Sequence, residues 1–244
     1  MRVLCVIPAR YDSTRLPGKP LADIAGKPMI QRVYERAAEA KLPELVVVAT
    51  DDARVLAAME SCGGKAMMTA KDHPTGTDRL AEVARAYANY DVIINVQGDE
   101  PLIAPQIIDD LATAFTEEPE LKMATVMTVI EDEGKNNPNN VKVVTDKNGY
   151  ALYFSRSLIP YPRTAGVVPV YKHIGIYAYR RDFLLEYAKM LPTPLEQSES
   201  LEQLRALENG YRIKVIKTDC KFVGVDTPED LARVNAIYKE IENK

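Results

Sequence analysis

The first half of the chain alternates between short apolar runs and segments with helical spacing, and this alternation constrains the fold more than any other feature. The apolar runs cover residues 3–7, 45–49, 66–69 and 91–96. Apolar residues recur with helical spacing over 29–40, 53–60, 77–87 and 107–115. Strands that alternate with helices in this way are typical of a doubly wound parallel sheet. We therefore predict an α/β fold for residues 1–121.

The pattern changes after residue 121, where strand-like runs follow one another more closely. Strands are predicted at 123–129, 141–145, 150–154, 172–179 and 212–217, with a turn at 146–149. Helices are predicted at 182–189, 199–208 and 228–241. The chain shows no internal repeat and no low-complexity segment. We predict one α/β domain over residues 1–244, in which a mostly parallel sheet flanked by helices continues into a subregion of antiparallel strands and helices in residues 122–244.

Composition excludes several classes of protein. The net charge is −4 at pH 7, so no overall positive charge favours binding to nucleic acid or to an anionic membrane. No apolar stretch reaches the roughly 18 residues of a membrane span, and the N-terminal apolar run is too short for a signal peptide. The cysteines Cys5, Cys62 and Cys220 lie far apart, without a metal-binding spacing. We expect reduced thiols and a cytoplasmic location.

A basic loop follows the first apolar run directly. It contains Arg10, Ser13, Arg15, Gly18 and Lys19. Ligands of open parallel sheets bind at the carboxyl ends of strands, and guanidinium and ammonium groups there would hold phosphate oxygens. The loop matches neither the P-loop pattern nor the dinucleotide-binding glycine pattern. We predict an anion site here, although the same charges would also suit a solvated surface loop.

Two aspartates are candidate metal ligands. Asp99 follows the apolar run that ends near Val96, so it should lie at the same sheet edge as the basic loop. Asp226 directly precedes Thr227, which has the features of a helix N-cap, so capping leaves Asp226 unexplained. Mg²⁺ prefers one or two carboxylates together with phosphate oxygens and water. The alternative for Asp99 is a turn aspartate that bonds its own backbone.

The basic loop, Asp99 and Asp226 belong to segments that closely resemble those of the 3-deoxy-manno-octulosonate (Kdo) cytidylyltransferases. The opening stretch, residues 6–21, indicates a nucleotidyltransferase. Three further stretches are specific to Kdo activation: Tyr-Phe-Ser-Arg at 153–156, His-Ile-Gly-Ile-Tyr at 173–177 and Leu-Glu-Gln-Leu-Arg at 201–205. The likeness also includes residues 49–52, 76–79, 95–101, 137–142 and 224–231. It therefore spans nearly the whole chain.

The resemblance implies a nucleotide-diphospho-sugar-transferase-like fold in which residues 1–121 bind CTP and residues 122–244 bind the sugar and form a homodimer. It implies the following roles. The nucleotide would be held by Arg10, Ser13, Arg15, Lys19, Gly76, Thr77, Arg79 and Gln97, and Mg²⁺ by Asp99 and Asp226. Catalysis would depend on Arg15, Lys19, Asp99 and Asp226, and the sugar would be bound by Arg156, His173, Tyr177, Glu202 and Gln203.

Composition and spacing alone would not select the residues assigned to the sugar. A single histidine on a strand is more often structural, and Arg156 has the features of a surface cation. Glu202 and Gln203 fall in the middle of the predicted helix 199–208, where a solvated face is the ordinary interpretation.

The activity that the resemblance implies is the reaction of CTP with Kdo to give CMP-Kdo and pyrophosphate, for lipopolysaccharide synthesis in the cytoplasm. Two alternatives stay open. The acidic sugar could instead be 8-amino-Kdo or a sialic acid, or the chain could be a nucleotide-sensing module without turnover.

Overall fold

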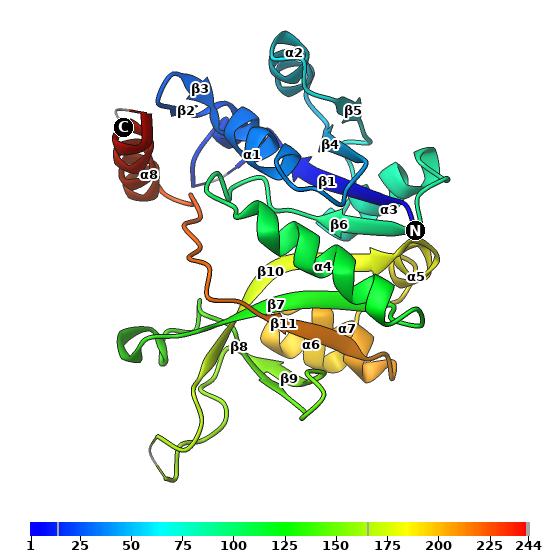
Figure 1. The fold of residues 1–244 in the computed structure, drawn as a ribbon, viewed down its shortest axis with the longest axis vertical. Coiled ribbons are helices and arrows are strands. Elements are labelled where there is room, and N and C mark those ends of the chain that lie inside the picture. The colour runs from blue at the N-terminus through cyan, green and yellow to red at the C-terminus, as the bar shows by residue number, and fades with distance from the viewer. Residues whose placement is uncertain (14, 165, 243–244) are drawn as a thin grey trace.

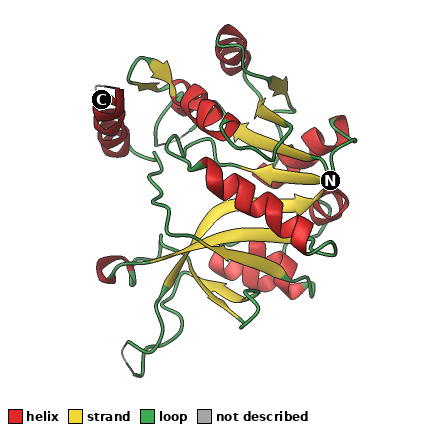
Figure 2. Ribbon diagram, in the orientation of Figure 1, coloured by secondary structure: helices red, strands yellow, loops and turns green. Residues whose placement is uncertain are grey.

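A nine-stranded sheet lies at the centre of the molecule (Figure 1, Figure 2). The computed structural model describes residues 1–13, 15–164 and 166–242; Thr14, within the basic loop, lies outside them. The main path of the sheet has the order β11-β7-β10-β6-β1-β4-β5, and β8 pairs with β10 and β9. The strands are β1 (Val3–Ala9), β4 (Leu45–Thr50), β5 (Ala66–Met68), β6 (Val92–Asn95), β7 (Met123–Val129), β8 (Lys142–Thr145), β9 (Ala151–Ser155), β10 (Tyr171–Arg180) and β11 (Ile213–Lys217).

The N-terminal part of the sheet is parallel. β1 pairs in parallel with both β4 and β6, and β4 pairs in parallel with β5. The carboxyl ends of β1 and β6 therefore lie side by side at one edge of the sheet, as the sequence predicted. β10 is antiparallel to β6 and β7, while β11 is parallel to β7. The result is the mixed, mostly parallel α/β sheet predicted above, extended by the antiparallel strands β8 and β9.

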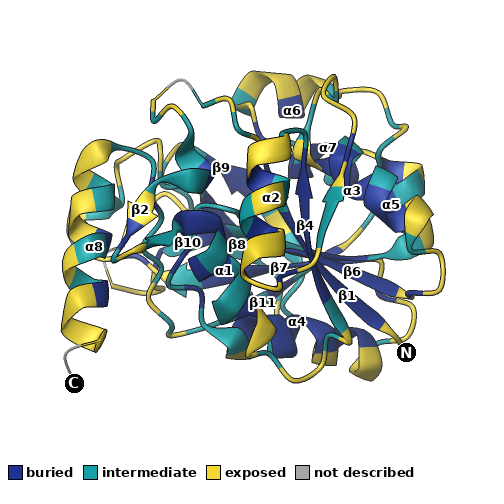
Figure 3. Ribbon diagram, turned by 90° about the horizontal axis from the view of Figure 1, so that it is seen from above, coloured by how far each residue is buried: buried dark blue, intermediate teal, exposed yellow. Residues whose placement is uncertain are grey.

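Helices cover both faces of the sheet because successive strand residues point to opposite sides. On β1, Cys5 and Ile7 belong to one apolar cluster, and Leu4 and Val6 to the other. The first cluster includes side chains of α1 (Met29–Ala38), α2 (Ala53–Ser61) and α4 (Pro105–Glu117). The second includes side chains of α3 (Gly76–Ala86), α5 (Arg181–Tyr187) and α7 (Gln203–Glu208). Figure 3 shows the buried strands between helices with exposed outer faces.

The prediction of one helix over 199–208 is wrong. The structure has two short helices, α6 (Pro194–Glu199) and α7, because Ser200 adopts a left-handed backbone conformation with φ 51° and ψ 50°. The start of α6 is fixed by the Thr193 amide, which donates to the Glu196 carboxylate at 3.1 Å. Glu202 is consequently the N-cap residue of α7 rather than a mid-helix residue. This position turns Glu202 and Gln203 toward the end of the sheet instead of toward solvent.

The C-terminal segment returns to the small hairpin that follows the β1 loop (Figure 1). After β11 it runs without regular structure to α8 (Pro228–Glu242). This helix packs on the small hairpin of β2 (Asp23–Ile24) and β3 (Lys27–Pro28) through a cluster that contains Ile24, Val225, Val234 and Tyr238. The contact places residue 226, which directly precedes this helix, beside the basic loop after β1.

The two short helices are joined by a nearly buried ion pair. The Arg205 guanidinium binds both oxygens of Glu196, with Nε 2.8 Å from Oε2, and the two side chains are 8% and 12% exposed. Removing one partner leaves a buried charge without compensation. We therefore expect Arg205→Met to lower the free energy of unfolding by about 3–5 kcal/mol in urea titrations. The double variant Arg205→Met, Glu196→Gln should recover more than half of that loss, and equal loss in both variants would contradict this explanation.

Candidate active site

A pocket of about 360 Å³ lies at the carboxyl ends of β1 and β6. It brings together residues from three distant parts of the chain: the basic loop, the turn after β6 and the segment before α8. Its lining includes Arg10, Ser13, Arg15, Lys19, Gln97, Asp99 and Asp226. All the predicted phosphate-binding residues of the basic loop and both predicted metal ligands therefore meet in one place.

Lys19 lies between the two aspartates. Its Nζ is 2.6 Å from Asp99 Oδ2 and 2.9 Å from Asp226 Oδ1, while Arg15 Nη2 is 3.0 Å from the same Asp226 oxygen. Burial alone would lower the pKa of Lys19, but the two carboxylates outweigh this effect and raise the pKa. Lys19 therefore stays protonated and presents a fixed positive charge to the pocket.

The turn after β6 packs tightly against the end of β1. A Cβ atom added to Gly98 would lie 2.6 Å from the Pro8 carbonyl oxygen, so only glycine fits there. The same turn is tied to the C-terminal segment, because the Val225 amide donates to the Asp99 carbonyl at 2.9 Å. These two close approaches hold Asp99 and Asp226 beside each other.

Glu100 is a partly buried acid that sequence reasoning did not assign to the site. Burial, and next the Asp99 carboxylate, raise the pKa of Glu100 to about 7. Its Oε1 would lie 3.1 Å from a Cβ added to Gly224. The Asp-Glu pair after β6 therefore has divided roles: Asp99 faces the pocket and Glu100 packs behind it.

A second, inner pocket of about 220 Å³ adjoins the first. Pro8 and Gln97 line both pockets. The other residues of the inner pocket come from α3, β6, β7, β10, α5 and the start of α7: Gly76, Thr77, Asn95, Met123, Tyr177, Tyr179, Tyr187, Glu202 and Gln203. Three of the five residues assigned to the sugar, Tyr177, Glu202 and Gln203, are therefore collected here.

Several polar side-chain atoms of the inner pocket have no hydrogen-bond partner in the described part of the protein. Burial raises the pKa of Glu202, and it also raises that of Tyr177, which lies near the Glu202 carboxylate. Glu202 Oε1, Gln203 Nε2 and Asn95 Oδ1 are buried and have no hydrogen-bond partner. Asn95 was not assigned a role from the sequence. The available signal was a polar side chain at the end of an otherwise apolar strand.

Three of the other residues that the resemblance assigned do not line either pocket. Arg79 is fully buried, with Nη2 2.9 Å from Asp51 Oδ2. The Arg156 guanidinium donates to the backbone carbonyls of residues 138, 199 and 200. His173 is buried between the rings of Phe154 and Tyr177. In this structure the polar groups of Arg79 and Arg156 are bonded to other protein groups, and the His173 ring packs against two aromatic rings.

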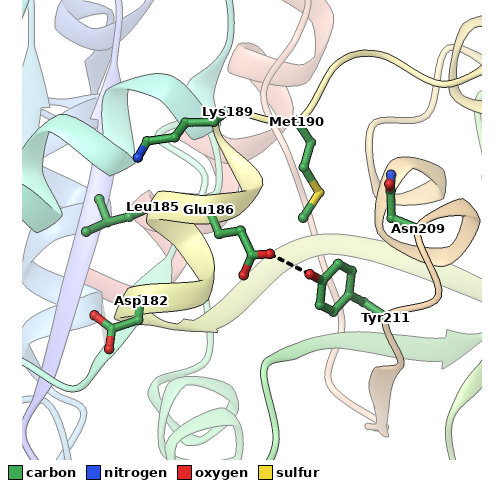
Figure 4. A pocket seen from close by; sticks show the side chains of 7 residues that line it. All are labelled: Asp182, Leu185, Glu186, Lys189, Met190, Asn209 and Tyr211. Atoms are coloured by element: carbon green, nitrogen blue, oxygen red, sulfur yellow. Dashed lines mark hydrogen bonds between the residues drawn. The ribbon is translucent and has the colours of Figure 1, made fainter.

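The described residues also form a shallower hollow of about 540 Å³ between α5 and the start of β11 (Figure 4). Tyr211 donates there to Glu186 Oε1 at 2.6 Å. None of the residues predicted from the sequence lines this hollow, so we do not connect it with the chemistry at the sheet edge.

The acidic groups of the edge pocket fit a Mg²⁺ site. One ammonium nitrogen already lies within hydrogen-bond distance of both Asp99 and Asp226, which shows that a cation can be shared between them. Within the described parts of the chain, no cluster of three or more histidine, cysteine, aspartate or glutamate side chains could hold a metal. Two carboxylates with phosphate and water completing the coordination are the arrangement that Mg²⁺ favours.

No helix in the described ranges is both long and apolar enough to cross a membrane.

Comparison with known proteins gives the class first. The cytidylyltransferase family model matches residues 4–216, which is most of the chain. The chain belongs to the cytidylyltransferase family.

Individual relatives narrow the comparison. A 3-deoxy-manno-octulosonate cytidylyltransferase of Fusobacterium nucleatum is 56% identical over 241 residues and covers 98% of each chain. The enzyme of the same name from Pelobacter propionicus is 52% identical over the full length of both. The solved structure of a CMP:2-keto-3-deoxy-manno-octonic acid synthetase complexed with CTP is 48% identical, with a TM-score of 0.95 over 98% of this chain and 99% of the other. The predicted nucleotide-diphospho-sugar-transferase-like fold is thereby confirmed.

The buried histidine gives a pH prediction. Burial, and next the charge of Lys172, lower the pKa of His173 to about 3, whereas an unfolded histidine titrates near 6.5. Below pH 6.5 the unfolded chain therefore binds a proton that the native state does not, so stability falls as the pH falls. We expect up to about 1.4 kcal/mol of this loss per pH unit, measured by urea unfolding between pH 7 and pH 4.

In the His173→Gln variant, the free energy of unfolding should no longer show this part of its dependence on pH. The His73→Gln variant, at the other histidine of the chain, should retain the dependence. An unchanged slope in the His173 variant would show that the ring takes up a proton in the native protein.

Proposed function

We propose that the chain transfers the cytidylyl group of CTP to the acidic sugar 3-deoxy-manno-octulosonate, giving CMP-Kdo and pyrophosphate. The observation that carries the proposal is the meeting of Lys19 with Asp99 and Asp226 at the sheet edge, next to a second pocket lined by Glu202 and Gln203. The names of the relatives that match over the full chain agree with this arrangement.

In the proposed reaction, a hydroxyl of the sugar attacks the α-phosphorus of CTP and pyrophosphate leaves. Arg10, Arg15 and Lys19 bind triphosphate oxygens, with Ser13 assisting. These cations would neutralise the negative charge that develops on the phosphoryl oxygens. His173 is a poor general base, because it is buried outside the pocket lining and its Nε2 lies 2.9 Å from Thr125 Oγ1.

Mg²⁺ is the cofactor that we propose, held by Asp99 and Asp226. When bound there, it would neutralise negative charge on phosphate oxygens. Lys19 would then move from its position between the carboxylates to the phosphates, while remaining protonated.

Some of the other residues proposed to bind the nucleotide or the sugar line a pocket, and others do not. Gly76, Thr77 and Gln97 line the inner pocket beside the edge pocket, where a nucleoside can reach them. Arg79 supports this wall through its bond to Asp51 rather than by direct contact. On the sugar side, Tyr177, Glu202 and Gln203 can touch the ligand directly, whereas Arg156 and His173 act through the walls.

A matrix of activities tests the proposal. Pyrophosphate release is measured with CTP, UTP or ATP combined with Kdo, 8-amino-Kdo or a sialic acid, in the presence of Mg²⁺. We expect the highest rate with CTP and Kdo. A higher rate with another acidic sugar would leave the reaction type intact and change the substrate, whereas CTP binding without pyrophosphate release would favour a nucleotide-sensing module.

We also propose that the protein forms a homodimer in the cytoplasm and that its product serves lipopolysaccharide synthesis. Exposed apolar side chains on β9 and the following segment support a dimer contact in the C-terminal half: Leu152, Tyr161, Val167 and Val168 are 62%, 85%, 70% and 55% exposed. Sedimentation equilibrium should give twice the mass of the 27.2 kDa chain. Leu152→Glu should shift the mass toward that of the monomer, and a wild-type protein of single-chain mass would contradict the dimer.

Substitutions at the edge pocket test the roles of the lysine and the aspartate. Lys19 supplies positive charge to the phosphoryl oxygens, and Asp99 would hold the Mg²⁺ that does the same, so Lys19→Met or Asp99→Asn should lower kcat by about 100- to 1,000-fold, the equivalent of roughly 3–4 kcal/mol. Pyrophosphate release with CTP, Kdo and Mg²⁺ measures the effect.

The matched control is Lys27→Met, which removes a surface lysine that pairs with Glu35 at 2.8 Å. It should retain the wild-type rate. Near-normal turnover in the Asp99→Asn variant would contradict the assignment of Asp99 as a Mg²⁺ ligand. Circular dichroism should show that all three variants are folded.

A further inference from the structure

The inner pocket holds an unusual concentration of unpartnered polar atoms. Among the described residues, six buried side-chain nitrogen or oxygen atoms have no hydrogen-bond partner. Three of the six, Asn95 Oδ1, Glu202 Oε1 and Gln203 Nε2, belong to residues that line this one pocket. Asn95 and Gln203 are only 8% and 5% exposed. Buried polar atoms are normally paired, so three orphans around one cavity indicate that a ligand supplies their partners.

The types of these atoms restrict the ligand. Asn95 Oδ1 and Glu202 Oε1 accept hydrogen bonds, and Gln203 Nε2 donates one. A carboxylate or a phosphate offers only acceptors and would be repelled by Glu202, and the lining contains no lysine or arginine to offset that repulsion. A hydroxyl group donates one hydrogen bond and accepts others, so two neighbouring hydroxyls would satisfy all three orphan atoms.

We propose that Asn95 is a specificity-determining residue which, together with Glu202 and Gln203, binds neighbouring hydroxyl groups of the sugar, and that the sugar's carboxylate lies outside this pocket. The inference rests on the proposed function, which supplies the sugar. Two hydroxyls donate to Asn95 Oδ1 and Glu202 Oε1, and one of them accepts from Gln203 Nε2. The carboxylate then faces the cations of the adjoining edge pocket.

The fold explains why these atoms converge. Asn95 is the last residue of β6 and pairs with Val6 on one side and Tyr177 on the other. Strand alternation puts its side chain on the same face as Ile93, which is the face covered by α7. Glu202 and Gln203 begin that helix, so the end of the strand and the start of the helix close on the cavity from opposite sides.

The first test is Asn95→Leu, which has a similar size and removes the acceptor. We expect kcat/KM for Kdo to fall about 10- to 100-fold, because a sugar hydroxyl loses its partner, while KM for CTP stays within about twofold. The melting temperature should be unchanged or higher, since an unpaired buried atom has been removed. The control is Asn209→Leu, the same substitution at the C-cap residue of α7, which does not line the inner pocket. It should change neither kcat/KM for Kdo nor KM for CTP.

The second test identifies the groups that the pocket recognises. Analogues of the sugar that each lack one hydroxyl, and a carboxamide analogue that lacks the acid, are compared on the wild-type and Asn95→Leu proteins. With at least one deoxy analogue, the wild-type and Asn95→Leu proteins should have the same kcat/KM. With the carboxamide analogue, kcat/KM should still differ between the two proteins.

Three outcomes would overturn the inference: an Asn95→Leu protein with wild-type kcat/KM for Kdo, a rise in KM for CTP alone, which would place the nucleoside rather than the sugar against Asn95, or a difference abolished only by the carboxamide. The wild-type protein separates these results from a failure of the proposed function. If it releases no pyrophosphate with CTP and Kdo, the proposed function itself is wrong, whereas failure of the inference leaves that rate intact.

Discussion

The site depends on one contact, the ammonium of Lys19 between the carboxylates of Asp99 and Asp226. Each group comes from a different part of the fold: the loop after β1, the turn after β6 and the segment before α8. Two like charges so close together would repel each other without a cation between them. The contact therefore stabilises the arrangement of three backbone segments and holds a cation between the two carboxylates.

The two pockets differ in electrostatic character although they adjoin. The edge pocket contains three cationic side chains, from Arg10, Arg15 and Lys19, and three carboxylates, from Asp12, Asp99 and Asp226. The inner pocket contains a single carboxylate, three tyrosines and amide groups, with no cation in its lining. Only the edge pocket therefore offers cations to a polyanion, whereas the inner pocket offers one carboxylate and uncharged polar groups. This division can orient an acidic sugar relative to a triphosphate without a moving lid.

Much of the fold could be predicted from periodicity, because strands buried on both faces appear as continuous apolar runs and their helices as amphipathic segments. β1, β4, β6 and β7 were placed to within about two residues of their observed ends. The single helix over 199–208 was wrong because apolar spacing does not reveal a left-handed residue such as Ser200. The β2–β3 hairpin, with two residues in each strand, was too short to give a pattern.

Only part of the candidate site could be predicted from the sequence. Charge and position alone indicated Arg15, Lys19 and Asp99, since carboxyl ends of parallel neighbours must meet at one edge. The packing that brings Asp226 there involves α8 and the β2–β3 hairpin, which no local pattern encodes. Asn95 was missed because a single amide at a strand end looks like an ordinary polar residue until the unpaired atoms around it are seen. The resemblance placed Arg79, Arg156 and His173 near the ligand, whereas in the structure their polar groups face other protein groups.

The position of Asp226 also has a consequence for the order in which the protein is made. Chains emerge from the ribosome with the N-terminal half first, and domains can begin to fold during synthesis. The β1 loop and the turn after β6 are synthesised long before residue 226, so Asp99 is available to Lys19 earlier than Asp226 is. Only when the final helix docks on the β2–β3 hairpin does the second carboxylate arrive. The contact of Lys19 with both carboxylates therefore becomes complete only after the docking of a helix that is synthesised well after the turn at Asp99.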